Sequence, residues 1–143
     1  FNNAADFLKL DKSKYLPGAT EYYDESGARV VEVVTTEIRM RPAEPGDQET
    51  VSVNLSLEGA TSTAIQVTGF DIDDVSETDM LINGQDVPLP AEIVADVAPR
   101  TVTIELEDSV LVEGENTITF VFANAYEGTT GFSIVDVRIL LRE

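Results

Sequence analysis

The stretches that decide the fold are 81-LINGQ-85, 114-GENTITFVF-122 and 131-GFSIVDVRI-139, all in the second half of the chain. The first places an Asn-Gly pair between flanking strand residues, which favours a type I′ hairpin turn because both residues tolerate positive φ. The other two are rich in β-branched and aromatic residues, which pack well in the interior of a sheet. Together they predict a hairpin turn followed by two long core strands.

Strand patterns also fill the chain upstream of these stretches, from Arg29 onward. Residues 51–58 and 102–107 alternate apolar with polar side chains, and a period of two buries one face of a strand. About seven or eight short strands with almost no helical period predict an all-β fold, an antiparallel jelly-roll β-sandwich. Residues 1–28 lack this pattern, so we expect an irregular N-terminal arm or linker there and the β-sandwich module over residues 29–143.

The composition excludes several functions. The 143 residues include no histidine and no cysteine, so Ser-His and Cys-His catalysis and imidazole or thiolate metal sites are ruled out. A formal net charge of -18 repels phosphate backbones and anionic lipids, so we expect no nucleic-acid binding. No apolar run reaches the ~18 residues that span a bilayer, so we expect no membrane insertion.

The three stretches resemble the galactose-binding-domain-like β-sandwiches that stand beside catalytic domains in secreted polysaccharide-degrading enzymes. Those modules often carry an Asn-Gly turn, a strand that begins Gly-Glu-Asn, and an apolar closing strand. The resemblance implies a noncatalytic carbohydrate-binding module, secreted or at the cell surface, with neighbouring domains in a larger chain. Its partner would be a poly- or oligosaccharide, and the negative net charge favours a neutral one.

Two other functional classes stay open. The first alternative is a structural or adhesion β-sandwich domain that binds no sugar. The second is an acidic β-sandwich hydrolase or lyase, which would need a deep cleft holding a carboxylate of perturbed pKa. We expect no enzymatic activity, because carboxylate pairs are too common in so acidic a chain to indicate a glycosidase.

The candidate sugar-binding residues lie in the polar loop between the two long strands. This loop contains Asn124, Tyr126 and Glu127. An aromatic ring can stack on a sugar face while amide and carboxylate groups bond its hydroxyls, and loops on a rigid sandwich commonly carry binding residues. The alternative is a tyrosine packed over the edge of the core, in which case the site would move to Tyr15, Tyr22 and Tyr23.

Acidic residues suggest calcium as a structural ion, because calcium takes about 6–8 oxygen ligands and clustered carboxylates supply them. The densest acidic segment is residues 71–79, and its candidate ligands are Asp71, Asp73 and Asp74, although its spacing is not that of an EF-hand. A solvated acidic edge is the alternative.

Asp136 lies inside the closing strand, where an unpaired carboxylate is unfavourable. The resemblance nominates it as a calcium ligand, with an early loop around Asp24. An ion pair with Arg138, two residues further on the same face, is the alternative.

Overall fold

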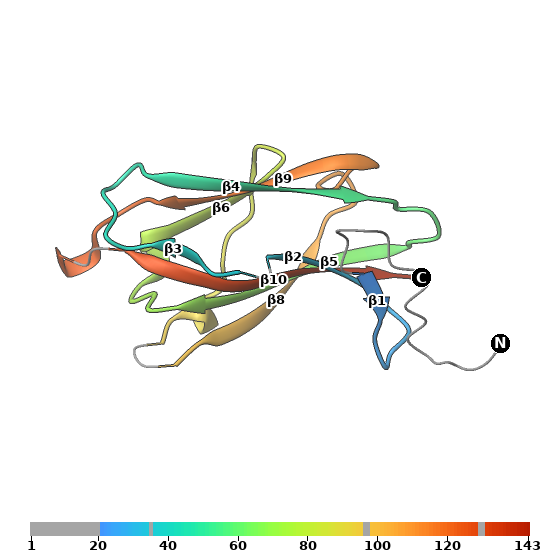
Figure 1. Cartoon of the computed structure of the whole chain (residues 1–143), viewed down its shortest axis with the longest axis horizontal. Coiled ribbons are helices and arrows are strands. Elements are labelled where there is room, and N and C mark those ends of the chain that lie inside the picture. The colour runs from blue at the N-terminus through green and yellow to red at the C-terminus, as the bar shows by residue number, and fades with distance from the viewer. Residues whose placement is uncertain (1–20, 35, 96–97, 129–130) are drawn as a thin grey trace.

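The computed structural model describes residues 21–34, 36–95, 98–128 and 131–143, which form a sandwich of two antiparallel β-sheets (Figure 1). The larger sheet has the order β1-β2-β10-β5-β8, and β3 pairs with the first residues of β10. Its strands are β1 (Glu21–Tyr23), β2 (Arg29–Val34), β3 (Ile38–Met40), β5 (Ser62–Phe70), β8 (Arg100–Leu106) and β10 (Phe132–Arg142).

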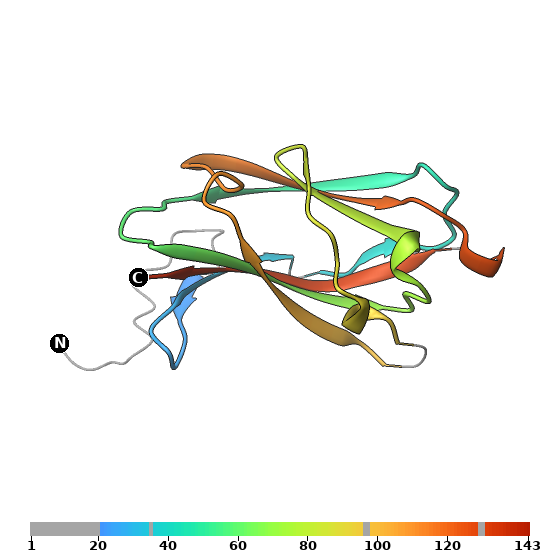
Figure 2. The ribbon, with the colours of Figure 1, turned by 180° about the vertical axis from the view of Figure 1, so that it is seen from behind.

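The smaller sheet has the order β4-β9-β6-β7. Its strands are β4 (Gln48–Leu55), β6 (Thr78–Ile82), β7 (Gln85–Asp86) and β9 (Gly114–Phe122). The connections include the short 3₁₀ helices η2 (Val75–Glu77), η3 (Ala91–Ile93) and η4 (Tyr126–Gly128). Figure 2 shows the segment from β7 to η3 crossing from the smaller sheet to the larger one. The predicted all-β antiparallel sandwich is confirmed.

The inner faces of both sheets supply the core. Phe120 and Phe122 of β9 are completely buried, and the ring centroid of Phe122 lies 6.1 Å from that of Phe132 on β10. Burial of each such side chain stabilises the fold by ~1.5–3 kcal/mol. Gly131 lies next to this core, and a Cβ there would stand only 1.7 Å from the carbonyl oxygen of Met40. The closing stretch therefore has to begin with glycine.

The Asn-Gly turn and the Gly-Glu-Asn strand meet in one polar cluster. Asn83 and Gly84 have φ values of 52° and 82°, which confirms the predicted turn with positive φ at both central residues. The Asn83 side chain donates to Asn116 Oδ1 at 2.8 Å and accepts from the Thr117 N–H at 2.9 Å. Asn116 is completely buried, and its amide nitrogen donates to two carbonyl oxygens nearby in the chain. We call Asn83 and Asn116 the asparagine cluster.

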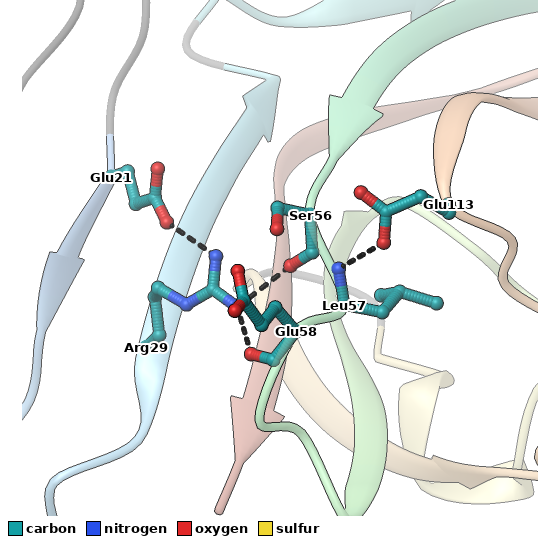
Figure 3. A network of polar contacts seen from close by, with 6 residues as sticks. All are labelled: Glu21, Arg29, Ser56, Leu57, Glu58 and Glu113. Carbon is teal, nitrogen blue, oxygen red and sulfur yellow. Dashed lines mark hydrogen bonds and ion pairs between the residues drawn. The ribbon is translucent and has the colours of Figure 1, made fainter.

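A second polar network lies at the same end of the sandwich (Figure 3). The Arg29 guanidinium donates to Glu21 Oε2 at 2.8 Å and to the Ser56 carbonyl oxygen at 2.7 Å. It also reaches the Glu58 carbonyl oxygen at 3.4 Å. These bonds connect the loop that follows β4 of the smaller sheet to β1 and β2 of the larger sheet. We call this part of the molecule, with the asparagine cluster, the anchor end.

The predicted domain boundary at residue 29 differs from the structure. Residues 1–20 of the predicted arm lie outside the described residues, but Glu21–Tyr23 forms β1 and pairs with β2. Tyr22 packs against the small apolar cluster formed by Val30 and Leu140. The Asp24 carboxylate accepts N–H groups in the β1–β2 turn. Residues 21–28 are therefore part of the sandwich, because a tyrosine pair flanked by a turn can add a strand to its edge.

Candidate functional site

Two loops that the sequence separates lie side by side in the structure. They are residues 71–77, between β5 and β6, and residues 123–128, which follow β9. The Asn124 amide nitrogen donates to Ser76 Oγ at 3.1 Å, and the Ala123 N–H donates to the Glu77 carbonyl oxygen at 2.6 Å. The strands explain this contact, because β6 begins where β9 ends, with Thr78 opposite Phe122. We call these two loops the loop end; it lies opposite the anchor end.

The predicted sugar-binding residues are grouped around η4. Asn124 and Glu127 are exposed, and Tyr126 is half-buried. Glu127 has a φ of 49°, a backbone conformation that is uncommon outside glycine and is often found at functional sites. Tyr126 thus has both an exposed portion and a buried one, and its role in sugar binding stays a prediction.

The Tyr126 hydroxyl faces negative charge from both loops. The adjacent Glu127 carboxylate, through its charge and a hydrogen bond, raises the pKa of Tyr126, and Asp74 and Asp73 add to the effect. The phenol therefore stays protonated at neutral pH and can donate a hydrogen bond. The sequence placed these groups in two separate sites, whereas the structure places them together.

Of the predicted metal-binding residues in the β5–β6 loop, Asp71 and Asp74 use their carboxylates in contacts within the protein. Asp71, with a φ of 64°, forms an ion pair with Arg41. Asp74 caps η2 by accepting the Ser76 N–H at 3.0 Å, and hydrogen bonds from Ser76 lower the pKa of Asp74. The Asp73 N–H donates to a further carboxylate, that of Glu77, at 2.8 Å.

Glu77 lies inside the predicted acidic segment, but the sequence did not single it out. It is completely buried, and its Oε1 atom has no hydrogen-bond partner. Burial raises the pKa of the Glu77 carboxyl from 4.5 to about 7; the charges of Asp73 and Asp71 add to this effect, and the N–H of Asp73 opposes it. In the sequence, Glu77 is one of several acidic residues in a segment whose composition predicts solvent exposure. No local pattern therefore indicates that its side chain is buried.

Asp136 lies away from these loops, on the outer face of the larger sheet. Arg138 Nε stands 2.9 Å from Asp136 Oδ2, and a second nitrogen of Arg138 stands 3.5 Å from Glu32 Oε2. Arg138 also donates to the Tyr22 hydroxyl at 2.9 Å. The ion pair that the sequence offered as the alternative is confirmed, so an arginine already compensates the Asp136 charge.

The suggested partnership of Asp24 with Asp136 does not form. Asp24 accepts the Ser26 hydroxyl at 2.6 Å in the turn before Arg29, and Arg29 pairs with Leu141 of β10. A strand rises ~3.3 Å per residue, so Asp136 is roughly 17 Å along β10 from that position. Across the described parts of the chain, no three Asp or Glu side chains converge into a preformed metal cluster. Calcium binding stays a prediction.

A shallow cavity of about 190 Å³ lies beside the loop end, between β3 and β4. Sequence reasoning did not find it, because it forms between strands of different sheets. Its lining residues are Arg39, Met40, Pro42, Ala43, Asp47, Gln48 and Glu49.

Comparison with known proteins identifies structures of similar fold but does not identify a family. No protein-family model matches the sequence, and a search of curated proteins finds no match. The β-porphyranase BpGH86A, of glycoside hydrolase family 86 from the human gut bacterium Bacteroides plebeius, is similar in structure, with a TM-score of 0.56 and 10% identity. The match covers 87% of this chain and 21% of that one.

Two further structures are similar. BuGH86 in complex with neoagarooctaose matches with a TM-score of 0.51 and 18% identity, over 85% of this chain and 18% of that one. A family 35 carbohydrate-binding module from an environmental isolate matches with a TM-score of 0.47 and 16% identity, over 91% of this chain and 80% of that one. The chain thus spans about a fifth of the length of the two family 86 structures. The antiparallel β-sandwich expected from the sequence is the fold that the two family 86 structures share with this chain.

Proposed function

We propose that this chain is a noncatalytic carbohydrate-binding module that binds a poly- or oligosaccharide at the loop end. The observation that carries the proposal is that Asn124, Tyr126 and Glu127 lie together, on η4 and in the residues just before it. One aromatic ring lies there beside an exposed amide and an exposed carboxylate. Such a set can stack on a sugar ring and bond its hydroxyls, and β9 and β10 hold it on a rigid frame.

A noncatalytic role is supported by the position of the one strongly perturbed carboxylate in the described residues. Glu77 has the raised pKa of a general acid, but its side chain is completely buried and cannot reach a substrate. This position of Glu77 supports a binding role over a hydrolytic one.

A neutral glycan is the proposed ligand class. The net charge of -18 would repel uronic or sulfated chains, and Tyr126 is itself surrounded by carboxylates.

The proposed setting is a secreted or cell-surface protein with neighbouring domains. A similar fold makes up about a fifth of the family 86 structures, which supports a place within a longer chain. In the structure the C-terminus lies at the end opposite η4 (Figure 1), so a following domain would leave the loop end free. Within the described residues, no helix is long and apolar enough to cross a membrane.

The test is binding to a glycan array and to neutral polysaccharides in affinity gels, with Tyr126→Ala beside the parent. We expect Tyr126→Ala to weaken binding about tenfold or more, as loss of a central aromatic contact commonly does. Tyr23→Ala tests the alternative tyrosine site and should keep the affinity of the parent, because Tyr23 is 43% exposed and belongs to β1, outside the loop end.

Two outcomes would overturn parts of this proposal. Unchanged affinity in Tyr126→Ala would remove the loop end as the site. No affinity of the parent for any glycan would favour the alternative, a structural or adhesion domain.

A further inference from the structure

The cavity between β3 and β4 lies next to the proposed sugar site. Where β9 ends and the segment leading to η4 begins, the Phe122 N–H donates to the Asp47 carbonyl oxygen at 2.8 Å. Where β10 begins, Phe132 pairs with Met40 of β3. The chain that lines the cavity therefore contacts both ends of the connection that carries η4. Figure 1 shows the β3–β4 and β9–β10 connections at the same end of the sandwich, on the left.

Three polar side chains of the cavity are available to a ligand. Arg39, Gln48 and Glu49 line it and are exposed, and none of their side chains has a hydrogen bond or ion pair with another described residue. Asp47 differs, because its carboxylate accepts the Glu44 N–H at 2.9 Å and holds the turn before β4. A guanidinium, an amide and a carboxylate thus share one cavity with their hydrogen-bonding capacity unused.

Arg39 differs from most arginines of the described chain, which are already paired with carboxylates. Acidic residues outnumber basic ones by 27 to 9, so partners are plentiful. The paired arginines are Arg29, Arg41, Arg138 and Arg142. Arg39 therefore keeps its donors free, although a carboxylate lines the same cavity.

The chemistry of the three free groups fits a neutral sugar. A guanidinium only donates hydrogen bonds, a carboxylate only accepts them, and an amide does both. A sugar hydroxyl both donates and accepts, so a polyhydroxyl ligand can bond all three. An anionic ligand would be repelled by Glu49 and a cationic one by Arg39. Apolar atoms for packing against the C–H groups of a sugar ring come from Met40, Pro42 and Ala43.

The size of the cavity fits part of a ligand rather than a whole one. Its volume of about 190 Å³ is below the ~300–1,000 Å³ of pockets that enclose drug-sized molecules. It therefore suits one sugar ring, and its shallow shape leaves that ring free to continue into a chain.

We propose that this cavity is a second sugar subsite, which binds a further ring of the same neutral oligosaccharide that Tyr126 contacts. Arg39 and Glu49 bond hydroxyls of that ring from its two polar sides. The inference rests on the proposed function and adds that the ligand is a chain and not a single sugar. Two subsites on one rigid frame favour longer ligands, because the second ring binds at a high effective concentration once the first is held.

The experiment is isothermal titration of neutral cello-, xylo- and agaro-oligosaccharides of two, four and six sugar units, with NMR titration for the weakest of them. The parent should bind its preferred six-unit sugar about tenfold or more tightly than the two-unit one. Arg39→Ala should bind the two-unit sugar like the parent and lose about fivefold or more with the six-unit sugar. Tyr126→Ala should lose affinity at every length.

Arg100→Ala is the matched control, because Arg100 is an exposed arginine at the start of β8 and its loss changes the net charge equally. It should bind every length like the parent. Glu49→Gln keeps the size of the side chain and removes its charge, so it should weaken only the longer sugars. The melting temperatures of all these variants should stay close to that of the parent, as is usual for surface substitutions.

The subsite is ruled out if Arg39→Ala and Arg100→Ala bind the six-unit sugar equally, or if the affinity of the parent does not depend on chain length. Tighter binding of uronic or sulfated oligosaccharides, weakened by added salt, would overturn the neutral ligand class. No binding of any sugar by the parent would instead overturn the proposed function, and the subsite with it.

Discussion

The two ends of the sandwich differ in how completely their buried polar groups are hydrogen-bonded. At the anchor end, the partly buried Arg29 bonds β1 and the β4–β5 loop (Figure 3). The completely buried Asn116 has hydrogen-bond partners in Asn83 and Val112.

At the loop end, Glu77 keeps an unpartnered buried oxygen, and Asp71 and Glu127 have positive φ. Asn83 at the anchor end also has positive φ, but it lies in an Asn-Gly hairpin turn that favours this conformation. Satisfied buried networks stabilise a fold, whereas strain and unpaired charge persist where binding needs them. We infer that the anchor end holds the fold and the loop end binds.

The largest effect is expected from Asn116→Ala at the anchor end. The Asn116 amide oxygen accepts the N–H of Val112 and the side chain of Asn83, so its loss leaves buried donors unpaired. At about 1–3 kcal/mol for each unpaired group, the free energy of unfolding should fall by ~3 kcal/mol. Urea unfolding measures this, with Asn54→Ala, at an exposed asparagine of β4, as the control. A loss no larger than that of the control would mean that the asparagine cluster does not hold the fold.

The second effect is a pH dependence of stability that originates at the loop end. The pKa of Glu77 is about 7 in the folded chain and ordinarily 4.5, so between these values the folded state binds more protons than the unfolded state. This contribution to stability is fully present below pH 4.5 and is lost as the pH rises through 7, by up to about 3 kcal/mol.

Urea unfolding in EDTA at pH 5, 6, 7 and 8 should therefore show metal-free stability decreasing over this range by more than it does in Glu77→Gln. Parallel pH profiles in the two proteins would show that Glu77 is not the titrating group.

A smaller effect is expected from Arg29→Lys. The guanidinium bonds one carboxylate and two carbonyl oxygens in different directions, a geometry that an ammonium group cannot match. The free energy of unfolding should fall by about 1–2 kcal/mol, with no selective change in ligand binding. Arg142→Lys, at a more exposed ion pair, should change it by less than about 1 kcal/mol. Equal losses in the two variants would remove the distinction between the Arg29 network and an ordinary surface pair.

The sequence predicted the anchor end better than the loop end, for a physical reason. Residues 81–85 and 114–122 reveal the Asn-Gly turn and the strand after it through local backbone preferences, whereas the hydrogen bond that joins Asn83 to Asn116 was not predicted. The ion pair of Asp136 with Arg138 was also predictable, because residues two apart on a strand share a face. The predicted features are all local patterns.

The contact between Ser76 and Asn124 was not predictable, because it depends on the register of β6 against β9. Burial of Glu77 depends on the same arrangement. The resemblance to known modules rested on the stretches around the asparagine cluster, so it indicated a fold and no ligand. The strand at residues 21–23 was not predicted, because three residues give too short a pattern. It forms through its pairing with β2.

The most direct test measures glycan affinity and the free energy of unfolding on the same preparations of Tyr126→Ala and Arg29→Lys. We expect opposite outcomes for the two variants. Tyr126→Ala should lose about tenfold or more in affinity while its stability stays within about 1 kcal/mol of the parent. Arg29→Lys should lose stability and keep its affinity while folded. Loss of affinity in Arg29→Lys, with Tyr126→Ala binding like the parent, would contradict the separation of the two ends.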